Sequence, residues 1–233
     1  MITMTLRETT VHTGLDTASE LAAGFEKRRA GRVDAGDVKE NLAELAAAGI
    51  TVAEIKDAAE RRAALRAVAA GCGATAFALA ETFSAGMAYG TLYDSAVRLG
   101  LAERAYEIAV ERVKARGIEV TGLPGTQFAV SRMRGSLATM VALLDRQSGR
   151  ATADGAAGLA EACTASLHVT PEADSVVSTA FSVLSGDRDG TARLTQIWHD
   201  LKAASAPVSA DLARELVGKA AVGIDPTETP RWL

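Results

Sequence analysis

The sequence predicts an all-α protein, and three observations carry this prediction. Apolar residues recur at helical spacing over most of the chain. Alanine and leucine fill most of these positions and aromatic residues make up 4% of the sequence, which favours closely packed helices. No run of alternating β-branched residues lies between turn-forming residues, so no strand is predicted.

The first third of the chain predicts three helices. A helix over residues 16–29 ends in three basic residues, which suit a helix C-terminus. A second helix can be capped by Asp34 and closed by Gly49. Thr51 and Glu54 have capping-box spacing, so a third helix is predicted to start at Thr51.

The middle of the chain predicts longer helices. The helical period continues to about residue 83 and is interrupted at residues 71–73, where two glycines flank Cys72. A long helix is predicted near residues 93–114, followed by a loop rich in glycine and proline. The next helix is expected to bury one apolar face, consisting of Phe128, Met133, Leu137, Met140 and Leu144.

The last third predicts a linker and four helices. The linker covers residues 146–158, which are rich in glycine, alanine and polar residues. Pro171 is expected at a helix start or at a kink. The predicted helices cover about residues 153–168, 171–184, 191–204 and 209–222.

Composition narrows the class of protein. With 233 residues, 48% hydrophobic and 23% charged, the chain has an ordinary globular composition. Its net charge of −4 does not favour a nucleic-acid partner. Cys72 and Cys163 lie far apart in apolar sequence and are expected to be buried thiols, with no metal site. Without a signal peptide or a run of about 20 apolar residues, a cytoplasmic protein with no membrane association is expected.

Two segments resemble the acyl-CoA dehydrogenase family, and residues 213–233, "ARELVGKAAVGIDPTETPRWL", resemble the tail of its hydroxylase-like members. Residues 96–117, "AVRLGLAERAYEIAVERVKARG", and 125–146, "GTQFAVSRMRGSLATMVALLDR", are similar to the helices that open that family's C-terminal bundle. The family's middle β-domain normally precedes them, but here residues 62–83 precede them almost directly. The resemblance implies N-terminal helices over 1–90 and a C-terminal four-helix bundle over 91–233, with the β-domain absent.

Departures from the family's pattern disfavour the binding of FAD, the family's cofactor, which stays the alternative to a chain without cofactor. The family's flavin-binding segment corresponds to "ARGIEVTGLP", which keeps Arg116 but lacks the phenylalanine. The glycine-rich turn corresponds to "LSGDRDG", where Asp187 and Asp189 would place negative charge near a pyrophosphate. The segment with the family's catalytic glutamate has no carboxylate here before Asp211. We therefore expect no cofactor.

Glu81 and His199 are the candidate catalytic residues. Glu81 interrupts an apolar helical face, and a carboxylate buried there would have a raised pKa suited to proton transfer. The alternative is that Glu81 lies on the exposed side of its helix. His199 lies beside Trp198 on a predicted helix, without a nearby serine or cysteine that would act as a nucleophile.

Four residues are candidates for binding a substrate. Tyr89, Tyr93 and Asp94 lie where the β-domain is missing and are expected to line a cleft, although packing tyrosines and a capping aspartate are the alternative. Arg132 is a candidate for binding a phosphate or carboxylate, unless it is a solvated surface arginine.

Two functions remain open at this point. The first is a degenerate, flavin-free subunit of an enzyme complex in specialised metabolism, which works with a second protein or as a homo-oligomer. The second is a non-redox enzyme that catalyses elimination or ring closure of an amino-acid-like or carrier-bound substrate, with Glu81 or His199 as proton acceptor.

Overall fold

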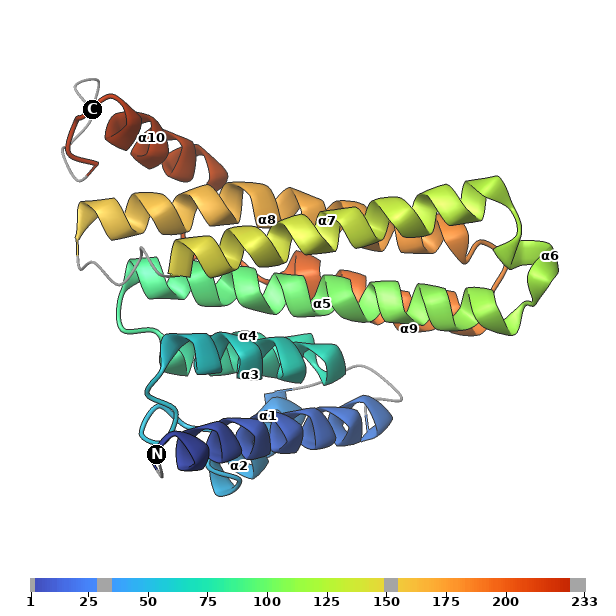
Figure 1. The fold of residues 1–233 in the computed structure, drawn as a ribbon, viewed down its shortest axis with the longest axis horizontal. Helices are drawn as coiled ribbons and strands as arrows, with labels where there is room; N and C mark the ends of the chain where they lie inside the picture. The colour runs from blue at the N-terminus through green and yellow to red at the C-terminus, as the bar shows by residue number, and fades with distance from the viewer. Residues whose placement is uncertain (1–2, 29–34, 149–154, 227–233) are drawn as a thin grey trace.

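The computed structural model describes residues 3–28, 35–148 and 155–226, and these residues form an all-α structure (Figure 1). The prediction of an all-α fold is therefore confirmed for the described residues. The helices are α1 (Thr3–Arg28), α2 (Ala35–Ala47), α3 (Ala58–Gly71), α4 (Gly73–Phe83), α5 (Met87–Ala115), α6 (Ile118–Thr121), α7 (Pro124–Ser148), α8 (Ala156–Val183), α9 (Arg188–Ala203) and α10 (Ala210–Ala221).

The helices are arranged in layers around α5 (Figure 1). On one side, α5 packs with α7, α8 and α9 as a four-helix bundle, and α10 lies on the outer side of α8. On the other side, α3 and α4 separate α5 from α1 and α2. One hydrophobic core extends through both sides. Residue 90, where the sequence analysis places the boundary between the N-terminal helices and the bundle, lies inside α5.

Glycines allow α3 to approach both of its neighbours closely. A Cβ atom at Gly71 of α3 would lie 2.0 Å from the backbone oxygen of Ala22 in α1. A Cβ atom at Gly100 of α5 would lie 2.6 Å from the backbone oxygen of Arg66. Because neither position has room for a side chain, these glycines determine the spacing of α1, α3 and α5.

A buried polar junction joins α4, α5 and α9. Asp200 accepts a hydrogen bond from the backbone N–H of Gly73 at 3.0 Å and thereby caps α4, since the Cys72 side chain makes no capping bond. Arg98 donates to the backbone oxygens of Leu201 and Ala204 at the end of α9. The junction thus satisfies polar groups at two helix ends.

The predicted helix start at Thr51 is wrong. Thr51 does accept a hydrogen bond from the backbone N–H of Glu54, as a capping box requires, but only a turn follows. Arg61 binds the backbone oxygens of Val52 and Ile55, which holds this turn out of helical geometry. The helix begins at Ala58, where Asp57 caps it.

Three further corrections concern α6, α7 and α8. Part of the predicted loop after α5 forms the short helix α6. Phe128 was expected in the core of α7 but is exposed, unlike Met133, Leu137, Met140 and Leu144. The two helices expected around Pro171 are one continuous helix, α8, because the core contacts of both halves outweigh the hydrogen bond that proline removes. The linker predicted over residues 146–158 is helical at both ends, in α7 up to Ser148 and in α8 from Ala156, and its residues 149–154 lie outside the described residues.

None of the helices in the described ranges is both long and apolar enough to cross a membrane.

Candidate functional site

A groove lies between the N-terminal helices and α5 in the described structure. It consists of two adjoining parts of about 460 and 310 Å³, which share Glu26 and Arg104. The first part lies among α1, α3 and α5, and the second extends to α9. We call it the interlayer groove. Its charged lining residues are Glu26, Arg66, Glu103, Arg104, Glu107 and Arg193.

Small residues create this groove. Ala63, Ala67 and Ala70 face it from α3, and their methyl groups leave the space between the helices unfilled. Gly71 and Gly100 bring the backbones of α1, α3 and α5 close together nearby. Small residues and long charged side chains therefore line the groove together.

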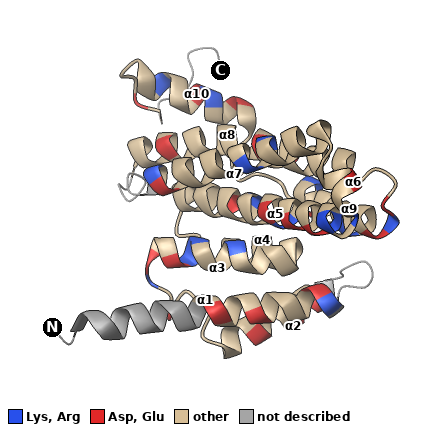
Figure 2. Ribbon diagram, turned by 45° about the vertical axis from the view of Figure 1, so that its right-hand side comes forward, with Lys and Arg blue, Asp and Glu red and all other residues tan. Residues whose placement is uncertain are grey.

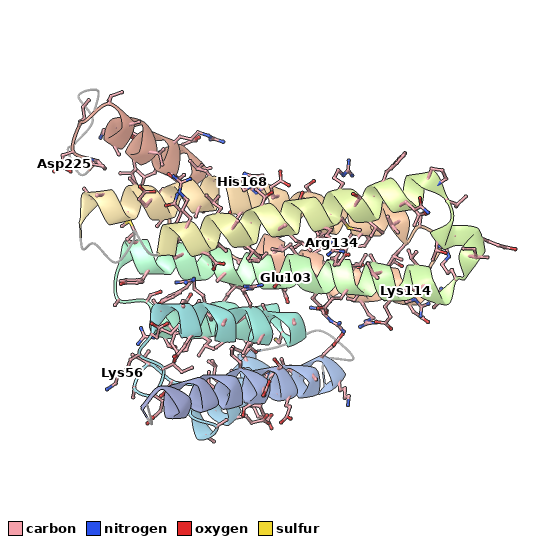
Figure 3. All side chains as sticks on the ribbon, viewed as in Figure 1. Lys56, Glu103, Lys114, Arg134, His168 and Asp225 are labelled. Carbon is pink, nitrogen blue, oxygen red and sulfur yellow. The ribbon has the colours of Figure 1, made fainter. Side chains whose placement is uncertain are left out.

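The charged residues of the groove are paired with one another. Glu26 accepts hydrogen bonds from Arg104 at 2.7 and 2.9 Å and from Arg193 at 3.0 Å. Arg104 also binds Glu107, and Arg66 binds Glu103 with both guanidinium branches. These pairs connect α1, α3, α5 and α9. Figure 2 shows basic and acidic residues along these helices, and Figure 3 labels Glu103 midway along α5.

The electrostatics of the groove keep its central carboxylate ionised. Partial burial acts to raise the pKa of Glu26, but the hydrogen bonds and charges of Arg104 and Arg193 lower it overall. Burial likewise acts to lower the pKa of Arg104, but its hydrogen bonds to Glu26 and Glu107 raise that pKa overall. A carboxylate held in this state is a poor proton acceptor at neutral pH, so the groove suits ionic cross-linking of helices better than acid–base chemistry.

Tyr89, Tyr93 and Asp94 do lie together, as the sequence analysis expected, but they are packed rather than open. Tyr93 is 1% exposed and stacks on Tyr89 with the ring centroids 5.9 Å apart. Burial raises the pKa of the Tyr93 hydroxyl, although a hydrogen bond with Arg61 acts to lower it. The expected open cleft is therefore not found at these residues.

Asp94 forms a buried ion pair with Arg98. Its carboxylate lies 2.7 Å from Nε of Arg98, and both side chains are 5% exposed. Burial raises the pKa of Asp94 even though the charge and hydrogen bonds of Arg98 act to lower it. Because Arg98 also holds the end of α9, this pair belongs to the buried junction between helices.

The remaining predicted site residues are not among those that line the groove. Glu81 lies on the exposed side of α4, so the burial on which its predicted role depends is absent. His199 is exposed on α9, with its ring 5.2 Å from that of Trp198. Arg132 is exposed on α7 and donates a hydrogen bond to the hydroxyl of Thr179 at 2.8 Å.

The structure places both cysteines in the interior. Cys72 and Cys163 are both buried and free, as expected. Burial raises the pKa of Cys163 to about 11, so its thiol stays protonated at neutral pH. Within the described ranges, no group of three or more metal-ligating side chains is arranged to hold an ion.

The interlayer groove was not predicted from the sequence. Glu26 lies 78 residues from Arg104 and 167 residues from Arg193 along the chain. Local periodicity places charges on the solvent-facing side of a helix, but it does not indicate which distant charge will lie opposite. A weak indication was available in the alanines of α3, which are small for a face between two helices.

Comparison with protein-family models, curated proteins and solved structures finds no match to this chain.

Proposed function

We propose that this chain is a flavin-free helical subunit of a biosynthetic enzyme complex, similar to the helical parts of acyl-CoA dehydrogenases, and that it acts by binding a partner protein. One observation carries the proposal: the ionisable residues that line the interlayer groove are paired with one another. A substrate in this groove would have to displace ion pairs that connect four helices. The groove therefore supports a structural role.

The positions of the predicted catalytic residues also support this proposal. Glu81 and His199 are exposed and lie outside the interlayer groove, and Asp94 is already paired with Arg98. The alternative, a non-redox enzyme that acts on an amino-acid-like or carrier-bound substrate, requires a proton acceptor facing a substrate-sized space. Glu81 and His199 do not meet that requirement in this arrangement.

Co-expression tests the proposal. The full chain is co-expressed with each protein encoded beside its gene, and complexes are identified by size-exclusion chromatography with light scattering. We expect a colourless preparation, a stable complex with one of these proteins, and partner turnover that rises when the chain is present. A monomeric chain that binds none of them and converts a substrate by itself would contradict the proposal.

Two variants separate the proposal from its alternative. Glu81→Gln and His199→Gln remove the candidate proton acceptors at exposed positions where folding should be unaffected. The complex that contains either variant should keep its full turnover. A general base, in contrast, contributes about 10²–10⁴-fold to the rate, so its loss would be obvious.

A further inference from the structure

The connection between α5 and α7 exposes three large apolar side chains. Ile118 is 80% exposed, Leu123 is 52% exposed and Phe128 is 73% exposed. They belong to α6, to the link after it and to the second turn of α7. We call residues 114–134, which include them, the α6 corner. Apolar side chains gathered on one exposed corner are typical of a surface that contacts another molecule.

Helix geometry explains why Phe128 does not reach the core. The buried stripe of α7 begins at Met133, five residues after Phe128. At 3.6 residues per turn, five positions rotate a side chain by about 140°, so Phe128 faces away from the bundle. Arg132 lies one turn after Phe128 on the same side of the helix, because residues four positions apart are neighbours. The exposed side of α7 thus presents an aromatic ring beside a positive charge.

The α6 corner is basic, although the whole chain has a net charge of −4. Within residues 114–134, Glu119 is the single acidic residue, and the basic residues are Lys114, Arg116, Arg132 and Arg134. Arg112 is paired with Asp187, and Arg132 binds a neutral hydroxyl. Lys114, Arg116 and Arg134 make no ion pair within 4 Å to a residue that the structure describes, although the charge of Arg116 acts on Asp187 from farther away. Figure 3 labels Lys114 on α5 and Arg134 on α7.

We propose that the α6 corner binds an amphipathic helix of an acidic partner protein. The apolar face of that helix would contact Ile118, Leu123 and Phe128, and carboxylates along its edges would pair with Lys114, Arg116 and Arg134. Charge complementarity selects an acidic partner and raises the rate of association, while the apolar contacts supply most of the affinity. This inference rests on the proposed function and identifies the chemistry of the partner.

The corner suits an acidic helix better than a second copy or a membrane. A symmetric contact between two copies would place the same basic residues opposite each other, which is unfavourable. Helices that lie on membranes present a long, continuous apolar face. Helix α6 has four residues, and α7 buries its main apolar stripe in the bundle.

A designed peptide tests the inference with the full chain. The probe is a helical peptide of about 20 residues with leucines along one face and glutamates on both sides, and its counterpart carries lysines in place of the glutamates. We expect the glutamate peptide to bind and the lysine peptide to bind at least about tenfold more weakly in fluorescence anisotropy. Added salt should weaken the binding of the glutamate peptide.

Exposed substitutions locate the binding surface. Phe128→Ser, and Lys114→Glu combined with Arg134→Glu, should each weaken binding of the glutamate peptide by about tenfold or more. Met87→Ser and Lys56→Glu are the controls, because both residues are exposed, Met87 begins α5 at the end opposite α6, and Figure 3 shows Lys56 far from the corner. The controls should change affinity less than twofold. Circular dichroism confirms that all four variants remain helical.

Several outcomes would overturn the inference. These are no binding, equal binding of the two peptides, or equal effects of corner and control variants. Binding of phosphatidylserine vesicles in place of the peptide would identify a membrane surface, and self-association lost in Phe128→Ser would identify a second copy.

If a co-expressed partner binds independently of the corner, this inference fails and the proposed function stands. Peptide binding by a chain that has no partner and turns over substrate alone would leave the corner supported and refute the proposed function.

Discussion

The two ends of α5 carry aspartate–arginine pairs with the same separation and opposite electrostatic behaviour. Asp94 lies 2.7 Å from Arg98 near the start of α5, and Asp187 lies 2.7 Å from Arg112 near its end. The pKa of Asp94 is raised, whereas the pKa of Asp187 is lowered to about 2. The distance between the two charged groups therefore does not by itself determine whether an ion pair raises or lowers the pKa of its carboxylate.

Solvation and additional hydrogen bonds account for the difference. Asp94 and Arg98 are both 5% exposed, so loss of hydration dominates at that end. Asp187 is itself only 7% exposed, but its pKa is lowered by the hydrogen bonds that Arg112 donates to it and by one from the backbone N–H of Gly190, where Asp187 caps α9, and Arg112 keeps a third of its side chain exposed. The buried pair organises a junction between helices, and the more solvated pair stabilises a turn.

The largest expected effect is at the buried pair. Arg98→Ala leaves Asp94 buried without its partner and releases the end of α9, so unfolding free energy should fall by about 3–5 kcal/mol. The control is Arg214→Ala, which removes an exposed pair with Asp211 and should cost about 0–1 kcal/mol. Urea unfolding measures both. Similar losses in the two variants would refute the distinction between buried and exposed pairs.

A smaller effect is expected where α1 meets α3. Gly71→Ala places a methyl group where the backbone of Ala22 lies, so the helices must separate, at a cost of about 1–3 kcal/mol. Gly135→Ala in α7 is the matched control, because open space surrounds that position and alanine favours helix by about 1 kcal/mol. The midpoint temperature of thermal unfolding should therefore fall in Gly71→Ala and rise in Gly135→Ala. A stabilised Gly71→Ala variant would show that the close approach is not real.

The pH dependence of stability sharpens the comparison at the other end of α5. The pKa of Asp187 is lower in the folded chain than its usual 3.8, so its ionised form adds stability above that value. This contribution is lost as the pH falls from about 4 to about 2. Asp187→Asn keeps the cap but removes the charge. Its unfolding free energy, measured by urea titration, should therefore be lower than that of the unaltered chain above about pH 4 and should approach it as the pH falls to about 2. A deficit that persists unchanged at pH 2 would contradict the assignment.

The sequence predicted the helical bundle well because its helices depend on local pattern. Met133, Leu137, Met140 and Leu144 share one face of α7, and their spacing is visible in the sequence. The start of α3 was mispredicted because Arg61 binds the carbonyls of an adjacent turn, a tertiary contact that the capping-box pattern does not include. Local patterns therefore place helices better than they place helix ends.

The candidate site was much less predictable. The sequence grouped Tyr89, Tyr93 and Asp94 correctly, since they are close along one helix. It did not show that Asp94 would form a buried ion pair with Arg98. The pairing of Glu26 with Arg104 and Arg193 joins three distant segments, and no local spacing encodes it. The exposure of Phe128 could have been anticipated from its angular offset to Met133.

Turnover of the reconstituted complex, measured over a range of subunit concentrations, tests the central claim most directly. The two variants to compare are Phe128→Ser at the α6 corner and Glu103→Gln in the interlayer groove. The account predicts that Phe128→Ser raises the concentration of chain needed for half-maximal turnover and that excess chain restores the maximum, while Glu103→Gln leaves both values unchanged. A maximal turnover that falls about 10²-fold in Glu103→Gln at saturating concentration, with folding intact, would place chemistry in the groove and contradict the account.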